Sequence, residues 1–220
     1  MSPAVTIALF WVGFSTTHIV LSSTRVRPRL VARMGQGAYL GLFSLVAAVF
    51  LIPATRVYFA SKATSVWLWA PDRGPLLSTG VYLLVGLGVV FMAASFANPR
   101  GVGRKEVAPG GIYRITRHPL VMGIGLWAAA HLIPNGRAVD VAWFGGFAVF
   151  AVIGCWHQDR RKLAGGDPAF RALHDATPFW PFAGGLSETA RGVRELQPWV
   201  VAIGIAAAVA LRLAHDPWLR

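Results

Sequence analysis

Long apolar stretches alternate with short charged segments along the chain, and this pattern predicts membrane-spanning helices. The apolar segments cover about residues 3–22, 38–58, 78–97, 119–134, 141–157 and 198–214. A helix rises about 1.5 Å per residue and a bilayer core is about 30 Å thick, so roughly 20 residues cross it. The first three segments meet this length. The last three are shorter, and Trp and Arg side chains beside them extend them into the interface.

This pattern predicts an all-α fold, a polytopic transmembrane helix bundle with about six spans. We expect a single membrane domain over residues 1–220. The composition agrees, because 55% of the residues are hydrophobic and 14% are charged, whereas soluble domains carry about 25% charged residues. The first apolar segment has no basic residues before it, so we expect a retained helix rather than a cleaved signal peptide.

Basic residues gather in alternate loops, which predicts how the chain is oriented. The first, third and fifth loops hold fifteen of the 21 Lys and Arg residues. Because positive residues in short loops stay on the cytoplasmic side, both termini are predicted outside and residues 157–197 form a cytoplasmic segment. The net charge of +12 does not indicate a nucleic-acid partner, since these charges flank apolar spans. Membrane lipid is the expected partner, and anionic inner-leaflet lipids explain the charge.

The cytoplasmic segment 157–197 contains signals for helix ends. Its first residues continue the fifth span as a helix, and Gly165 and the glycine after it end that helix. Asp167 is a suitable N-cap and Pro168 a suitable first helical residue for a short helix on the inner membrane face. Pro178 is expected to stand beyond the end of that helix.

Two histidines, His18 and His131, lie within the apolar spans, where an unpaired polar group is costly. One interpretation is structural: each is a neutral imidazole bonded to a neighbouring helix, or each marks a close helix contact. The other interpretation is a metal or haem site. Neutral imidazole is a common iron ligand, and a helix bundle offers an apolar slot for a porphyrin.

A polar cluster is predicted at the cytoplasmic face. His118 suits the cap position of the fourth span and Pro119 its first turn, while Arg117 adds positive charge to a helix N-terminus that attracts anions. Asp159 and Arg160 leave the fifth span at the same face, so a network with Arg117 or His118 is plausible. The structural alternatives are a positive-inside anchor with a cap and a solvated helix end.

The strings GIYRITRHPLVMGIGLWAAAHLIPNG (111–136) and GCWHQDRRKLAGGDPAFRALHDATPFWPF (154–182) resemble the NnrU family of membrane proteins. Plant and bacterial zeta-carotene isomerases belong to the same family. The similarity includes the first span with His18 and residues 27–45. It implies a haem b protein that isomerises a cis double bond of a lipid-soluble carotene when its iron is reduced, with His18 and His131 as iron ligands. NnrU proteins are also associated with nitrogen-oxide metabolism in denitrifying bacteria, which implies a bacterial inner membrane.

A more distant resemblance is to the isoprenylcysteine carboxyl methyltransferases, which also pair an Arg-His-Pro motif with a later cytoplasmic segment. Two adjacent glutamates in that segment help to hold S-adenosylmethionine. Asp159 and Arg160 stand at these positions here, so the second acid is replaced by a base. The alternative hypotheses are therefore a methyltransferase-like enzyme using Arg117, His118 and Asp159, and a non-enzymatic assembly or regulatory factor for a respiratory complex.

The depth of the histidines leaves two ligand pairs open. His18 lies four residues from the cytoplasmic end of its span, about 6 Å, whereas His131 lies thirteen residues beyond His118, about 20 Å. Helix tilt would reduce this difference. His18 with His118 is the depth-matched alternative, and His18 with His131 is the pair that the family resemblance implies.

Overall fold

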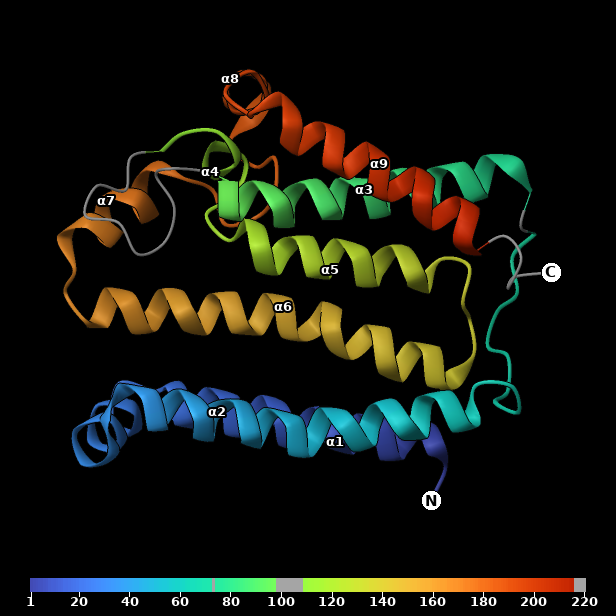
Figure 1. The fold of residues 1–220 in the computed structure, drawn as a ribbon, viewed down its shortest axis with the longest axis horizontal. Helices are drawn as coiled ribbons and strands as arrows, with labels where there is room; N and C mark the ends of the chain where they lie inside the picture. The colour runs from blue at the N-terminus through green and yellow to red at the C-terminus, as the bar shows by residue number, and fades with distance from the viewer. Residues whose placement is uncertain (73, 98–108, 216–220) are drawn as a thin grey trace. The chain divides into compact units, whose positions relative to one another are not determined.

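The computed structural model describes residues 1–72, 74–97 and 109–215, and its regular elements there are all helices (Figure 1). They are α1 (Pro3–Ser22), α2 (Val26–Ser61), α3 (Pro75–Ala97), α4 (Ile112–Ile115), α5 (Pro119–Leu132), α6 (Ala138–Ala164), α7 (Pro168–Ala176), α8 (Gly185–Arg194) and α9 (Pro198–His215). The all-α prediction is confirmed. The helices form two compact units: Met1–Pro71 with Asn135–Gly165, and Asp72–Pro134 with the described part of Gly166–Arg220.

The lengths of the apolar helices support a polytopic membrane protein. Among the described residues, α1, α2, α3 and α6 are each long and apolar enough to cross a bilayer. The helix α9 meets the same test when it is joined to α8, from which it is bent by 95°. The helix α5 has 14 residues, so it is about 21 Å long and shorter than a bilayer core of about 30 Å.

The first unit fixes the direction of α6. The Tyr58 hydroxyl, near the end of α2, donates a 2.8 Å hydrogen bond to Asp140 at the start of α6. Ser22, at the end of α1, is hydrogen-bonded to His157 in the second half of α6 at 3.1 Å. α6 therefore runs antiparallel to α2 and parallel to α1. If α2 crosses the membrane, α3 and α5 together must return the chain to the side where α2 ended. If α3 also crosses, α5 must complete that return despite its length.

The start of α2 differs from the prediction. The second span was expected to begin at 38 after a basic loop, but α2 begins at Val26, and its helical path is broken at Gly35, where φ is 81°. Arg29 and Arg33 thus lie on a helical segment rather than in a loop. Glycine suits this break because it adopts a positive φ without a Cβ clash. The basic residues before the apolar stretch do not prevent helix formation. The position at which the second span begins stays a prediction.

A buried carboxylate ties α2 to α6 in the first unit. Asp140 is fully buried in the first turn of α6. Besides the Tyr58 bond, it accepts a 3.2 Å hydrogen bond from the Arg137 backbone N–H, and it lies 3.7 Å from the Lys62 ammonium. The positive end of the helix dipole also stabilises it there. The partners together compensate the cost of burying the charge.

The loop after α2 is fastened to the segment before α6. The Leu68 N–H donates to the Gly136 carbonyl at 2.7 Å, and the Ala138 N–H donates to the Val66 carbonyl at 3.0 Å. The Arg137 guanidinium lies 4.3 Å from the centroid of the Trp67 ring, a cation–π contact. These bonds keep the end of α2 beside the start of α6.

In the second unit, α3 and α5 cross at two glycines. A Cβ on Gly88 would lie 2.9 Å from the Gly123 carbonyl oxygen, and a Cβ on Gly123 would lie 2.7 Å from the Gly88 carbonyl oxygen. Close approach through small residues is a common way for membrane helices to associate. On the other side of α3, Gly204 of α9 faces Val90 with no room for a Cβ. The second unit therefore packs α5 and α9 on α3.

The predicted helix ends near residue 165 are confirmed. The helix α6 continues to Ala164 and is capped by Gly165. The helix α7 begins at Pro168, and the Asp167 carboxylate accepts a 3.0 Å hydrogen bond from the Ala169 N–H. The capping chemistry of Asp and the fixed φ of Pro explain why this boundary was predictable.

Single cysteines introduced at Thr24, Thr64 and Asn135, with Cys155 replaced by Ala, test the crossing argument. We expect a membrane-impermeant maleimide added to intact cells to label Thr64→Cys and Asn135→Cys but not Thr24→Cys, because positive-inside orientation places the α1–α2 turn inside. Labelling is measured by mass shift, with permeabilised cells as the control for reactivity. Labelling of Thr64→Cys and Asn135→Cys from opposite sides would contradict the crossing of α5.

Candidate functional site

The Arg-His-Pro motif lies between α4 and α5, in the second unit. His118 occupies the N-cap position of α5 and Pro119 its first helical position, as predicted. Neighbouring Thr116 is fully buried and His118 is 6% exposed. The motif is thus an interior connection between two helices and not a solvated loop.

Arg117 is bonded to the segment that follows α7. Its backbone N–H donates to the Pro178 carbonyl at 3.0 Å, and its guanidinium Nη1 donates to the Thr177 carbonyl at 2.7 Å. The guanidinium carbon also lies 5.3 Å from the centroid of the Phe179 ring. Arg117 therefore supplies hydrogen-bond donors to carbonyl groups that have no partner within a helix.

Two further hydrogen bonds join the same segment to residues 115 and 116. The Thr116 hydroxyl donates to the Phe179 carbonyl at 2.8 Å, and the Phe182 N–H donates to the Ile115 carbonyl at 3.1 Å. The rings of His118 and Phe179 are edge-to-face at 5.6 Å. Residues 115–117 and 177–182 thus form one paired structure, which we call the motif pairing.

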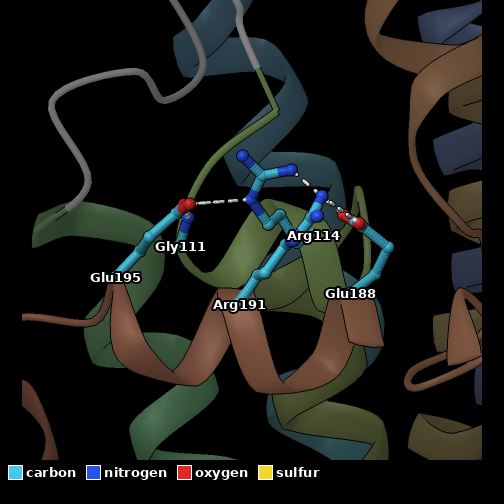
Figure 2. Close-up of polar contacts among 5 residues, drawn as sticks. All are labelled: Gly111, Arg114, Glu188, Arg191 and Glu195. Atoms are coloured by element: carbon cyan, nitrogen blue, oxygen red, sulfur yellow. Dashed lines mark hydrogen bonds and ion pairs between the residues drawn. The ribbon is translucent and has the colours of Figure 1, made fainter. Parts of the chain in front are cut away.

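An ionic network holds α4 against α8 beside this pairing (Figure 2). Arg114 donates from Nε to the Glu195 carboxylate at 3.0 Å and from Nη1 to Glu188 at 3.0 Å. Glu195 also accepts a 2.7 Å bond from the Gly111 N–H, and Glu188 pairs with Arg191 at 3.0 Å. The hydrogen bonds that Arg114 donates to Glu195 are the main cause of the raised pKa of its guanidinium. The network fixes both ends of the four-residue helix α4.

Gly192 makes this contact between α4 and α8 possible. A Cβ at Gly192 would lie 2.8 Å from the Gly111 carbonyl oxygen, 3.0 Å from the Ile115 Cγ1 and 3.3 Å from the Arg114 Cβ. Two of these atoms belong to α4 and the third to the residue just before it. Any side chain at Gly192 would push α8 away from α4.

His131 lies in the last turn of α5, in the second unit. Its Nδ1 is 2.8 Å from the Trp127 carbonyl oxygen, so Nδ1 carries the proton and donates it. The neutral ring then has its lone pair on Nε2. The centroid of the Trp127 ring is 4.7 Å away. A histidine that ligates a metal through one nitrogen commonly donates from the other to a backbone carbonyl, so His131 has the arrangement of an Nε2 ligand.

His18 lies in the last turn but one of α1, in the first unit, and is surrounded by aromatic rings. The centroid distances are 4.2 Å to Phe43 of α2, 5.0 Å to Phe14 of α1 and 5.1 Å to Phe150 of α6. The side chain is half-buried, and its ring makes no hydrogen bond to any residue that the structure describes. A ring nitrogen in this apolar setting is available to a ligand.

The structure shows a polar neighbour of His18 that the sequence reasoning missed. His157 of α6 lies within electrostatic range of His18. The Ser22 hydroxyl donates its single hydrogen to the His18 carbonyl at 2.7 Å, so His157 Nε2 must be the donor in its 3.1 Å bond to Ser22. The lone pair of a neutral His157 is then on Nδ1. His157 was overlooked because it stands at the predicted end of the fifth span, and nothing in the sequence indicates that it lies near His18 of α1.

Asp159 and Arg160, predicted as neighbours in one polar network, lie in different surroundings within the first unit. Asp159 is 5% exposed and lies one helical turn after the fully buried Cys155. Arg160 is exposed, and its guanidinium carbon lies 4.6 Å from the Trp156 ring centroid. Arg117 and His118 belong to the second unit. A network between these pairs therefore stays a prediction.

The haem ligand pair is likewise a prediction, because His18 belongs to the first unit and His131 to the second. The alternative partner His118 also belongs to the second unit. In the described part of the chain, no group of three or more His, Cys, Asp or Glu residues could hold a metal ion. Haem iron needs only one or two protein ligands.

Comparison with known proteins confirms the family resemblance. The family model described as NnrU protein matches residues 6–220. The chain is 29% identical over 193 residues to the 15-cis-zeta-carotene isomerase, chloroplastic, of Zea mays and 26% identical over 189 residues to that of Arabidopsis thaliana. Each alignment covers 83% of this chain and 50% of the relative. The chain thus spans about half the length of these relatives. No solved structure matches it.

The contact between α4 and α8 can be tested by Gly192→Ala. The added methyl group would overlap the Gly111 carbonyl, so we expect a loss of stability of about 1–3 kcal/mol. Unfolding of the detergent-solubilised protein, followed by tryptophan fluorescence, measures it. Gly145→Ala is the control, since a Cβ there meets nothing within 4 Å and alanine favours a helix. Equal stability of the two variants would contradict the close contact at Gly192.

Proposed function

The chain belongs to the NnrU family, and we propose that it is a membrane isomerase that converts a cis double bond of a lipid-soluble polyene, using haem b bound by His18 and His131. The observation that carries this proposal is the similarity, over 83% of the chain, to two proteins named 15-cis-zeta-carotene isomerase. The proposed location is a bacterial inner membrane, with both termini outside. The substrate class is a carotene with a central cis bond.

The chemistry of isomerisation suits a protein with few ionisable groups in its apolar spans. Rotation about a double bond moves no atoms between molecules and leaves the oxidation state of the polyene unchanged. The protein needs to hold the conjugated chain, exclude water and provide a centre that weakens the π bond. A carotene dissolves in the bilayer core, so it reaches the helices from the lipid side.

The surroundings of His18 suit a flat conjugated group. The rings of Phe14, Phe43 and Phe150 come from three different helices and offer apolar faces and edges, which bind π systems well. In the proposal, these rings hold a planar group beside the His18 imidazole. Haem, when bound, would supply an iron whose reduced state permits the isomerisation.

The hydrogen bond from His131 Nδ1 to the Trp127 carbonyl supports its role as an iron ligand. This bond fixes the tautomer and orients the ring, which is what a ligand histidine requires from its surroundings. The His18 ring makes no such hydrogen bond to the residues that the structure describes, and aromatic rings pack against it. We propose that His131 is the more rigid of the two ligands.

Arg117 and His118 have a positioning role in this proposal. The Arg117 guanidinium is bonded to Thr177 and lies over Phe179, and His118 caps the helix that ends with His131. The motif pairing thus fixes the base of α5. The methyltransferase alternative, which would use Arg117, His118 and Asp159, stays a second hypothesis.

Isomer analysis in a carotenoid-producing host tests the activity. In bacteria engineered to accumulate 15-cis-zeta-carotene and grown in the dark, we expect the intact chain to convert this isomer, as measured by chromatography of extracted pigments. His18→Ala and His131→Ala should abolish conversion. His174→Ala is the matched control, since this histidine pairs with Asp175 on α7. Persistence of the 15-cis isomer in the presence of folded wild-type protein would sink the proposed activity.

Absorption spectra of the purified protein test the cofactor separately. Wild-type protein from haem-supplemented cells should show a Soret band, and His131→Ala should lower haem content about tenfold or more, because a direct ligand is lost. His18→Ala should also lower it, whereas His174→Ala should not. Full haem content in both ligand variants would refute the assignment. A Soret band without isomerase activity would favour a nitrogen-oxide role.

A further inference from the structure

One end of the first unit carries basic side chains around the buried Tyr39. The Tyr39 hydroxyl donates a 3.2 Å hydrogen bond to the Leu21 carbonyl, which joins α2 to the last turn of α1. The Arg27 guanidinium carbon lies 5.8 Å from the centroid of the Tyr39 ring. Arg161 of α6 lies within electrostatic range of both Tyr39 and Arg27. Three helices that lie side by side thus bring Arg27 and Arg161 together (Figure 1).

These two arginines, which we call the basic pair, have no counter-charge among the residues that the structure describes. No carboxylate in the described residues forms an ion pair with Arg27 or Arg161. The Nε atom of Arg161 is buried and has no hydrogen-bond partner there. Both side chains are half-buried. Like charges that are partly withdrawn from water repel each other strongly, and a buried N–H donor without an acceptor is unfavourable.

His157 lies beside the basic pair. It lies one helical turn before Arg161, and the positive charge of Arg161 acts on its ring. Because its Nε2 proton is donated to Ser22, the ring is held beside the end of α1. The positive charge and the unused N–H donor at this end of the unit therefore come from the basic pair, and an anion would satisfy both.

We propose that the basic pair, Arg27 and Arg161, binds a phosphate group. Guanidinium groups match phosphate oxygens with paired hydrogen bonds, which favours phosphate over a simple halide. The pair lies where α1 ends and α2 begins, at the ends of membrane-spanning helices, where lipid headgroups lie. The phosphate can belong to an anionic lipid headgroup or be free in solution, and the experiment distinguishes these sources.

Thermal unfolding in lipid nanodiscs tests the proposal. The full chain is placed in phosphatidylcholine alone, in phosphatidylcholine with phosphatidylglycerol, or in phosphatidylcholine with added inorganic phosphate. We compare wild type, Arg161→Gln and the control Arg29→Gln, which removes the same charge from an exposed position on α2. Tryptophan fluorescence gives Tm, and its dependence on the amount of probe gives an apparent affinity.

Phosphatidylglycerol should raise Tm of wild type and of Arg29→Gln equally, and it should bind Arg161→Gln about tenfold more weakly, since charge-assisted hydrogen bonds are lost. In phosphatidylcholine alone, Arg161→Gln should melt at least as high as wild type, because it lacks the repulsion. If inorganic phosphate raises Tm as much as phosphatidylglycerol does, the bound group is free phosphate. If only phosphatidylglycerol raises Tm, the bound group is the lipid headgroup.

Two results would overturn the proposal. One is the absence of any rise in Tm of wild type with either probe. The other is an equal rise for wild type and Arg161→Gln, which would show that surface charge alone attracts the anion. If Arg161→Gln does not fold, Arg27→Gln provides the same comparison from the opposite member of the pair.

Discussion

The motif pairing between residues 115–117 and 177–182 is the interaction on which the second unit's polar site depends. A connection between helices that is buried must satisfy its own N–H and carbonyl groups, because neither water nor a helix does so. Here the backbone and side chains of Thr116 and Arg117 provide the partners for Thr177, Pro178 and Phe179. The pairing thus joins the Arg-His-Pro motif to the later Thr-Pro-Phe segment, although about 60 residues separate them in the sequence.

Two further contacts give the pairing a rigid base. The ion pairs of Arg114 and the close packing at Gly192 hold α4 against α8. The close approach of Gly88 and Gly123 holds α5 against α3. His118 then starts α5 at a fixed point and His131 ends the same helix. In the first unit, Asp140 has the corresponding structural role, since it joins α2 to α6.

Sequence reasoning predicted the features that depend on local chemistry. Apolar segments of sufficient length predicted the helices, Asp167 and Pro168 predicted the start of α7, and Gly165 predicted the end of α6. Each of these depends on a few adjacent residues, so the sequence contains the whole signal. The helix before Gly35 was not predicted, because its basic residues were assigned to a loop.

Features that depend on contacts between distant residues were not predicted. Asp140 stood just outside a predicted span, and its partner Tyr58 lies 82 positions away. His157 became a candidate only when its bond to Ser22 was known. Nothing local distinguishes the Arg117 that anchors a distant segment from an arginine that marks the inner side of the membrane. The sequence could therefore predict which residue types the candidate site contains, but not how they are arranged in space.

Hydrogen–deuterium exchange of the detergent-solubilised protein tests the motif pairing most directly. The amides of Arg117 and Phe182 lie outside the helices but donate to Pro178 and Ile115, so peptides covering them should exchange as slowly as those from α5. Exchange at the rate of an unstructured loop, while α5 stays protected, would contradict the pairing and the positioning role that follows from it.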